Sequence, residues 1–498
     1  MQNPYQTSRF KQPGRSVFNL SYEKKFTCDM GQLIPIMCDE VVPGDIFSIG
    51  NEIVVRFQPL VAPVLHEINV YVHYFYVPYR ILWDDWEDFI TGGEDGLDDS
   101  VIPVWDVTFN TVGSLWDYLG FPLGIDVAGA QPMNFPRYAY NEIYNAYYRD
   151  ENLITKIVNT NEAILRRAWE KDYFTSSMPF QQRGTAPALP ISGTSEAVWN
   201  ATAFADGEPP GSKNAVNVEA TNVDDFNFYT AQTRGGLNLK GALEDNEVDL
   251  SSATTFDVAD LRLVFQIQKW LEANARGGAR YTEFLKHHFG VSPTDERLNR
   301  PEYIGGSKSP VIVSEVLQTS ETGTSPQGTL AGHGLTASRN FCAKYRVKEF
   351  GLIMGIMSIM PRTAYHQGIN RQWLRETKYD FYFPEFAHLS EQPVLEREVY
   401  ASGVEAQNET VFGYQGRYNE MRAKRSMVCG EMHATFDYWH LCRQFGARPV
   451  LNKEFVECVP RKDIFASPEE NGLIVNIANI IKAVRPMPIS ADPGMMGH

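Results

Sequence analysis

The chain has 498 residues, of which 43% are hydrophobic, and its formal net charge is −16. The longest apolar run, Phe350–Met360, is too short to span a bilayer, and the polar first residues do not form a signal peptide. Six cysteines without a C-x-x-C pair do not form the framework of a secreted disulfide protein. We therefore expect a soluble protein that is made in a cytoplasm and keeps its thiols free.

The composition also bears on fold class and domain number. Aromatic residues make up 12% of the chain. The chain also contains 38 glycines and 29 prolines. This balance favours an all-β scaffold with many turns over a helical bundle. A chain of this length has room for two or three domains.

The first 25 residues carry five cations against Glu23, a net charge of +4. We interpret them as a mobile arm that can bind phosphate without reading base sequence. A plain disordered terminus is the alternative. The candidate DNA-facing residues of this arm are Arg9, Lys11, Arg15, Lys24 and Lys25.

Alternating side chains predict strands early in the chain. Glu52–Phe57 places apolar residues on one face only, which is typical of a half-buried strand. Ile68–Val77 is apolar or aromatic on both faces, so this strand should be central and covered on both sides, and Pro78 should end it. Further predicted strands are Val311–Leu317, Tyr345–Ile353, Lys378–Phe383 and Ser426–Thr435.

Two acidic segments account for nearly all of the net charge. Trp83–Ser100 holds eight acidic residues and no basic one, and Ile191–Thr255 holds ten acidic and three basic residues. Both should be exposed, either as the outer face of a larger assembly or as ordinary solvated loops. Glycine, proline and serine punctuate Ile191–Thr255, which predicts a long surface loop or a small inserted domain.

Helical patterns interrupt the strands. Tyr138–Tyr148 is one candidate, and Asp257–Arg276 is the clearest, because Thr254 begins it and two glycines follow its end. Tyr281–Phe289 predicts a short second helix. Strands separated by long, helix-bearing connections indicate a β-sandwich with insertions and not a βαβ fold.

Residues Tyr365–Val394 are dense in aromatic side chains, arginine and histidine. Such a mixture suits protein–protein contact surfaces, and an aromatic-rich β core is the alternative. A basic cluster with interleaved tyrosines follows, which fits either single-stranded nucleic acid or a set of interface ion pairs. Its cations are Arg417, Arg422, Lys424 and Arg425, and the candidate subunit-contact aromatics of the chain are Trp83, Trp86, Trp373, Tyr382 and Trp439.

Motifs of catalysis and metal binding are incomplete. His66–Val70 begins like a zinc-protease helix but lacks the second histidine, and Pro301 stands where a phosphate-binding loop needs its first glycine. The zinc-competent side chains Cys429, His433, His440 and Cys442 have a spacing that matches no known finger, so we interpret them as core residues. We expect no catalytic site, metal or cofactor.

Short motifs resemble, in the same order along the chain, the major capsid protein of small tailless single-stranded-DNA phages, the gokushovirus branch of the Microviridae. The motifs are Leu33–Pro35, Asp39–Asp45, Phe75–Arg80 with Trp83 and Trp86, Arg300–Gly306, Pro326–Gly328, Gly332–Gly334, Trp439–Leu441 and Arg485–Pro488. Each motif alone is weak evidence for the resemblance, whereas their shared order along the chain is strong evidence. Ile191–Thr255 lies outside the resemblance.

The resemblance implies an eight-stranded antiparallel jelly roll of the viral capsid type with long insertions. Its parts would be a basic arm and lead-in at 1–50, a first part of the jelly roll at 51–190, a surface protrusion at 191–255, and the remainder at 256–498. The chain would assemble through pentamers, in the cytoplasm of a host bacterium, into a T = 1 virion shell of about sixty copies around circular single-stranded DNA. The protrusion would contact a host receptor.

The capsid interpretation also implies further partners. At −16 each, about sixty copies carry roughly −960, so the shell does not neutralise its cargo. We therefore predict a small basic internal DNA-binding protein, and a minor or pilot virion protein is also expected. The alternatives are a carbohydrate-binding or glycan-hydrolysing β-sandwich, for which abundant aromatic and acidic residues would serve, and a minor receptor-binding spike.

Overall fold

A computed structural model describes most of the chain, and the chain divides into two compact units. The described residues are 14–105, 110–124, 128–187, 197–198, 216–222, 225–230, 247–248, 258–278, 280–319, 327 and 330–490. The first unit comprises residues 1–181 and 274–498, and the second comprises 182–273. Arg9, Lys11 and most of the insertion predicted at 191–255 lie outside the described residues. The predicted domain boundaries stay a prediction.

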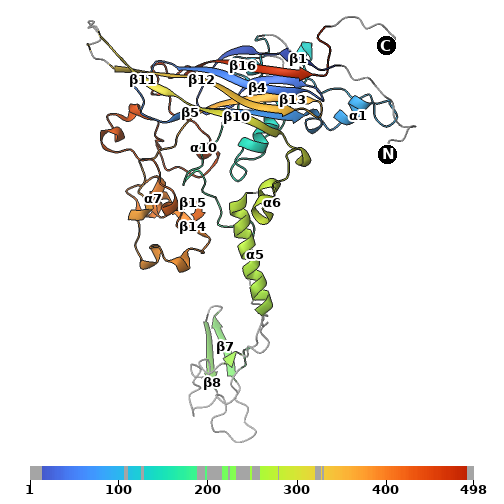
Figure 1. Cartoon of the computed structure of the whole chain (residues 1–498). Coiled ribbons are helices and arrows are strands. Elements are labelled where there is room, and N and C mark those ends of the chain that lie inside the picture. The colour runs from blue at the N-terminus through green and yellow to red at the C-terminus, as the bar shows by residue number, and fades with distance from the viewer. Residues whose placement is uncertain are drawn as a thin grey trace. The chain divides into compact units, whose positions relative to one another are not determined.

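Two large antiparallel sheets form the centre of the first unit (Figure 1). The larger sheet has the order β1 (Ser16–Asn19), β16 (Leu473–Arg485), β4 (Ile46–Phe57), β12 (Leu330–Arg346) and β11 (Ile312–Leu317), and β2 (Tyr22–Cys28) also pairs with β16. The smaller sheet has the order β10 (Glu302–Pro310), β5 (Ile68–Pro78), β13 (Gly351–Pro361) and β3 (Ile34–Val41).

Strands that follow one another in sequence mostly alternate between these sheets. β2, β4, β12 and β16 belong to the larger sheet, whereas β3, β5, β10 and β13 belong to the smaller one. The last strand, β16, inserts between β2 and β4, which is the connection pattern of a jelly roll. The predicted fold class, a mainly β jelly roll with helix- and loop-bearing insertions, is confirmed. The described sheets hold six and four strands, so the predicted number of eight is not confirmed.

The main hydrophobic core lies between the two sheets. Val55 and Ile477 of the larger sheet and Val72 and Tyr74 of the smaller one belong to it and are at most 1% exposed. Alternation along each strand directs one side chain in two into this layer, which is why a half-polar strand such as β4 can be stable there.

A second core covers the other face of the smaller sheet. Phe75 and Val77 of β5 pack there with Tyr140 and Ile143 of α3 (Phe135–Ile143), which continues as a π-helical turn over Tyr144–Tyr148. β5 is therefore buried on both faces, as its sequence predicted.

Short helices lie in the connections, and a third core supports a lobe built on β14 (Glu391–Leu395) and β15 (Val411–Gly416). The α-helices of the first unit are α1 (Trp86–Thr91), α2 (Leu115–Leu119), α3, α6 (Tyr281–Phe289), α7 (Glu396–Val399), α8 (Glu405–Asn408), α9 (Asn419–Arg422) and α10 (Lys453–Val456). The 3-10 turns are η1 (Tyr79–Ile81), η2 (Ala128–Ala130), η6 (Glu296–Leu298), η7 (Arg371–Trp373), η8 (Lys378–Asp380), η9 (Pro384–Phe386), η10 (Gly430–His433) and η11 (Asp437–Trp439).

The second unit contains two small strand pairs and most of the longest helix. β7 (Val216–Asn222) pairs with β8 (Asp225–Thr230), β6 (Ala197–Val198) pairs with β9 (Glu247–Val248), and α5 spans Val258–Gly277. The helices predicted at Asp257–Arg276 and Tyr281–Phe289 are confirmed. The apolar side of α5 is exposed within the chain, with Leu263 at 57% and Trp270 at 49%. No helix in the described part of the chain is long and apolar enough to cross a membrane.

Three predicted strands are wrong. Tyr345–Ile353 spans the turn between β12 and β13, where Gly44 donates a backbone hydrogen bond to the Val347 carbonyl. Lys378–Phe383 contains the 3-10 turn η8, because the Asp380 carboxylate accepts hydrogen bonds from the Thr377 backbone and hydroxyl. Such local bonds compete with a sheet ladder. Ser426–Thr435 holds η10, which begins at a glycine with φ of 69°.

Candidate nucleic-acid interface

The outer face of the larger sheet, which points away from the core, gathers cations from strands that are distant in sequence. Register places Lys344 of β12, Ser48 of β4 and Lys482 of β16 in one row across the sheet. The next row joins Arg346 to Ile46. Strand pairing, and not proximity in the chain, creates this surface.

Four cations of this outer face are exposed, and in the described part of the chain none of them forms an ion pair. They are Arg56, Lys344, Arg346 and Lys482. Two other cations of the face are neutralised by neighbours, since Lys25 pairs with Glu23 at 2.8 Å and Arg339 with Glu52 at 2.9 Å. The face therefore has an excess of positive charge in a chain whose total charge is negative.

An aromatic ring accompanies these cations. Phe341 points outward from β12, opposite Gly50 of β4, and is 71% exposed. A Cβ at position 50 would come within 2.9 Å of the Asn340 carbonyl oxygen, so the neighbouring strand can carry only glycine at this close approach. Arginine and lysine around an exposed ring are the components of single-strand binding surfaces, where bases stack and phosphates are neutralised.

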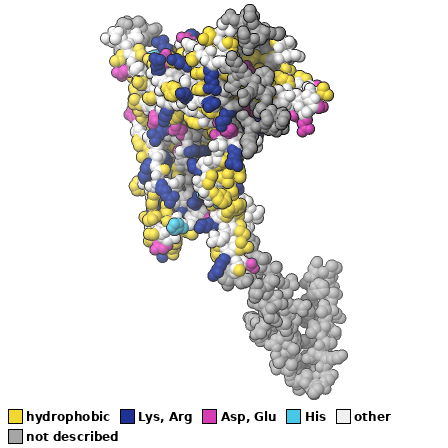
Figure 2. All heavy atoms as spheres, turned by 45° about the vertical axis from the view of Figure 1, so that its right-hand side comes forward, with side chains coloured by type: hydrophobic (Ala, Val, Ile, Leu, Met, Phe, Trp, Pro, Cys, Tyr) yellow, Lys and Arg dark blue, Asp and Glu magenta, His cyan; other side chains and the backbone are white. Residues whose placement is uncertain are grey.

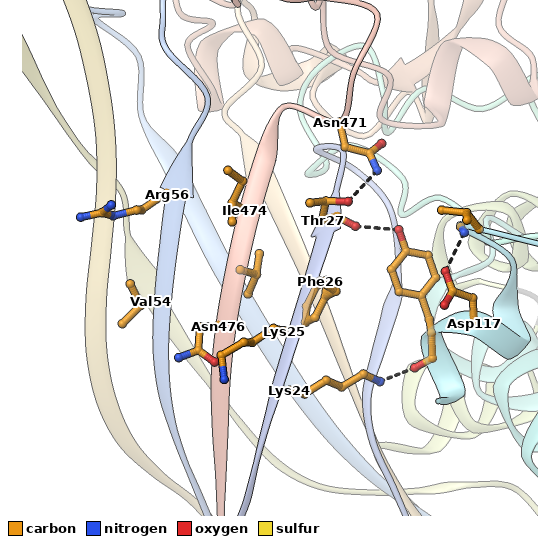
Figure 3. A pocket seen from close by; sticks show the side chains of 14 residues that line it. Lys24, Lys25, Phe26, Thr27, Val54, Arg56, Asp117, Asn471, Ile474 and Asn476 are labelled. Carbon is orange, nitrogen blue, oxygen red and sulfur yellow. Dashed lines mark hydrogen bonds between the residues drawn. The ribbon is translucent and has the colours of Figure 1, made fainter. Parts of the chain in front are cut away.

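A cavity of about 530 Å³ lies at one end of the same face (Figure 3). Lys25, Arg56, Ile474 and Asn476 line it from the sheet, and Val112 lines it from the loop before α2. Figure 3 shows polar and apolar side chains side by side on these strands, with the Lys25 and Arg56 chains extending from the sheet. The cavity can therefore accept a flat or apolar group beside the Arg56 guanidinium.

Hydrogen bonds hold the wall of this cavity in place. The Tyr118 hydroxyl donates to the Thr27 carbonyl at 2.7 Å, and the Asn471 amide donates to the Thr27 hydroxyl at 3.1 Å. Lys24 donates to the Pro35 carbonyl at 2.7 Å and to the Tyr118 carbonyl. Burial lowers the pKa of Lys24 to about 8. Lys24 thus connects β2 to β3 and α2 and is not a free cation on the surface.

The predicted DNA-facing residues fall into two groups that the structure does not bring together. Arg15, Lys24 and Lys25 belong to or precede the larger sheet. The basic cluster belongs to the lobe of β14 and β15, where Arg425 donates to the Glu398 and Gly368 carbonyls. Arg417 donates to the Tyr379 carbonyl there, whereas Arg422 and Lys424 are exposed. Figure 2 shows that Lys and Arg side chains are interspersed with hydrophobic ones over one face of the molecule.

The predicted contact aromatics also separate into two kinds. Trp83 and Trp86 are half-buried against the second core, with Trp86 4.9 Å from Tyr79 between ring centroids. Trp439 is half-buried as well. Trp373 and Tyr382 are exposed, at 75% and 51%.

Three of the four zinc-competent side chains, His433, His440 and Cys442, make other contacts. His433 and His440 each bond a backbone carbonyl, and the Cys442 thiol lies 3.2 Å from Nδ1 of His366. Among the described residues, no group of three or more ligands is arranged to hold a metal ion. All six cysteines are free. Cys429 and His433 are exposed, so the prediction that they are core residues is wrong, whereas His440 and Cys442 are buried as predicted.

Comparison with known proteins gives a consistent assignment. The family model described as capsid protein (F protein) matches residues 6–495. The chain belongs to this family of phage capsid proteins. It is 33% identical to the capsid protein VP1 of Chlamydia phage 1 and 34% identical to that of Bdellovibrio phage phiMH2K, over 97% of this chain and 96% of each relative. Identity to VP1 of Spiroplasma virus 4 is 30%, over 97% and 95%.

This family assignment confirms the resemblance to gokushovirus-type Microviridae. The protein is a structural, non-enzymatic capsid protein that self-assembles and is located in the virion. The family assignment therefore favours the capsid interpretation over the alternative of a carbohydrate-active β-sandwich. The sequence missed Lys344, Arg346, Lys482 and Phe341 as surface candidates. An alternating pattern over Leu473–Arg485 was a usable signal for the strand that carries Lys482.

Proposed function

We propose that this capsid protein forms a T = 1 icosahedral shell of about sixty copies, through pentamers, around circular single-stranded DNA. The outer face of the larger sheet would point toward the DNA. The observation that carries this orientation is a group of four exposed cations, without ion pairs in the described part of the chain, on the face that also carries the exposed ring of Phe341. Counterion release from DNA phosphates would give this face affinity for any base sequence.

The other proposed partners follow from charge and from the insertion. A net charge of −16 per chain leaves the cargo largely unneutralised, which supports a small basic protein inside the shell. Residues 191–255, an acidic insertion within the second unit, would contact a host receptor. A minor or pilot virion protein would complete the particle, which would assemble in the bacterial cytoplasm.

The orientation is tested by the salt dependence of DNA binding. In the test variant, glutamine replaces the four cations, as Arg56→Gln, Lys344→Gln, Arg346→Gln and Lys482→Gln. Binding of an unstructured oligothymidine is measured between low and moderate salt. Each phosphate contact on a single strand contributes about 0.7 to the slope of log affinity against log salt, so the slope should fall by about 3.

A matched variant loses four cations from the lobe of β14 and β15, as Lys378→Gln, Arg417→Gln, Arg422→Gln and Lys424→Gln, and should keep the slope of the unmodified chain. An unchanged slope in the sheet variant, or a larger loss in the lobe variant, would contradict the proposed orientation. Sedimentation of the unmodified chain, expressed with its proposed basic partner, tests shell formation itself. Only monomers under all conditions would refute it.

A further inference from the structure

The segment between β5 and α2 contains an acidic surface, which we define as residues 84–99. Its eight carboxylates are all exposed, and in the described part of the chain none of them forms an ion pair. Three apolar side chains around it are also exposed, Ile90 at 47%, Leu97 at 79% and Val101 at 82%. Exposed apolar groups that lie together can form part of a contact surface, and the carboxylates around them would then give that surface its charge complementarity.

The lobe of β14 and β15 presents exposed aromatic rings beside exposed cations. We define the aromatic–basic surface as the exposed rings of residues 373–383 together with the exposed cations Lys378, Arg422 and Lys424. The exposed rings are Trp373, Tyr379, Phe381, Tyr382 and Phe383, which are between 42% and 75% exposed.

Buried ion pairs hold this surface rigid from beneath. Arg371 bonds the Glu398 carboxylate at 2.9 Å, and Arg375 lies 3.9 Å from that of Glu420. The Tyr418 hydroxyl donates to the Phe381 carbonyl at 3.0 Å. Because the underlying side chains are fixed, the exposed rings need little reorganisation to bind a partner.

The two surfaces are complementary but belong to different parts of the first unit. The acidic surface includes α1, whose Trp86 packs on the second core, whereas the aromatic–basic surface lies on the lobe of α7, β14 and β15, apart from α1 in Figure 1. Contact between unlike surfaces of identical chains is heterologous, and repetition around an axis closes a ring. Complementary charge orients such encounters, and buried rings supply much of the affinity.

We propose that the acidic surface of one copy docks on the aromatic–basic surface of the neighbouring copy in the shell. The proposal rests on the proposed function, since it describes one of the contacts by which the shell closes. It assigns the charge of residues 84–99 to assembly and assigns the exposed basic residues of the lobe to protein contact instead of DNA.

Charge reversal tests the pairing. One variant carries Asp84→Lys, Glu94→Lys and Asp99→Lys, at carboxylates that have no hydrogen bond among the described residues. A second carries Lys378→Glu, Arg422→Glu and Lys424→Glu. Each should lower the yield of closed shells, measured by sedimentation, by about tenfold or more. A third variant combines all six changes and should recover most of the yield, because the attraction returns with its signs exchanged.

A matched control carries three acidic-to-lysine changes at exposed sites outside both surfaces, as Glu409→Lys, Glu454→Lys and Glu469→Lys, and should assemble like the unmodified chain. Thermal unfolding of each unassembled variant checks that the fold is intact. Shells at normal yield from both single-surface variants would overturn the proposal, as would failure of the six-change variant to recover.

A lobe variant that assembles normally but loses DNA affinity would instead assign the aromatic–basic surface to nucleic acid. If the unmodified chain forms no shells with its partners, the proposed function fails. If the unmodified chain forms shells and both charge-reversal variants form them at the same yield, only the docking proposal fails.

Discussion

Tyr140 links three segments of the fold through one hydroxyl group, and its removal should have a measurable cost. The side chain is fully buried on α3. Its hydroxyl donates to the Leu33 carbonyl at 2.8 Å and accepts from the Leu165 backbone N–H at 2.9 Å. Leu33 and Leu165 also bond each other, from N–H to carbonyl, at 2.9 Å. The hydroxyl therefore completes the junction between the lead-in to β3 and the connection after α3.

The substitution Tyr140→Phe keeps the ring and removes both of these bonds. One carbonyl and one N–H would then lack a partner in a dry environment, and each unsatisfied group costs about 1–3 kcal/mol. We expect the free energy of unfolding to fall by about 2–4 kcal/mol. Urea unfolding of the unassembled chain, followed by tryptophan fluorescence, measures the change as a lower midpoint with an unchanged slope.

The control is Tyr382→Phe, because that side chain is 51% exposed and its hydroxyl has no hydrogen bond among the described residues. It should change stability by less than about 0.5 kcal/mol. A loss below about 1 kcal/mol in Tyr140→Phe would refute the reasoning, since it would mean that water or local movement satisfies both backbone groups.

Two further changes test burial and backbone geometry. Burial raises the pKa of Glu396 to about 7, so the folded state holds a proton that the unfolded chain releases near its ordinary pKa, and stability falls as pH rises from about 4.5 to 7. Glu396→Gln should therefore stabilise the chain by about 1–3 kcal/mol at pH 8 and leave it unchanged at pH 4, and equal melting shifts at both values would contradict this. Gly31→Ala should lower the melting temperature far more than Gly113→Ala. Both glycines have φ near 80°, but only at Gly31 would a Cβ collide with the Cys458 carbonyl. An equal fall in melting temperature for both variants would show that the positive φ alone, and not the collision, determines the loss of stability.

Local patterns in the sequence predicted those parts of the fold that depend on burial within a single element. The two-sided apolar character of Ile68–Val77 correctly indicated a strand covered by two layers. The same reasoning failed at Lys378–Phe383, because alternation was present but the Asp380 carboxylate closes a local turn. Side-chain capping outweighs weak periodicity in such short segments.

The candidate interface was harder to predict, because its members meet only through sheet pairing. Lys344 and Lys482 share a row although 137 positions separate them in the sequence, and no local pattern encodes that register. The sequence predicted Lys24 as a DNA-facing cation, but in the fold its ammonium group is bound to two carbonyl groups. The order of motifs along the chain identified the family without requiring either observation.

The position of β16 has a consequence for how the protein is made. This strand pairs with β1, β2 and β4. The sheet that contains residues near the start of the chain is therefore complete only after residues 473–485 have been synthesised. Pairings between distant segments form slowly, and unpaired edges are prone to aggregate until they are covered. A growing or truncated chain therefore lacks the strand that joins β2 to β4. Only a chain that includes β16 can complete the larger sheet, so the loss of residues 473–485 would leave β1, β2 and β4 without their shared partner strand.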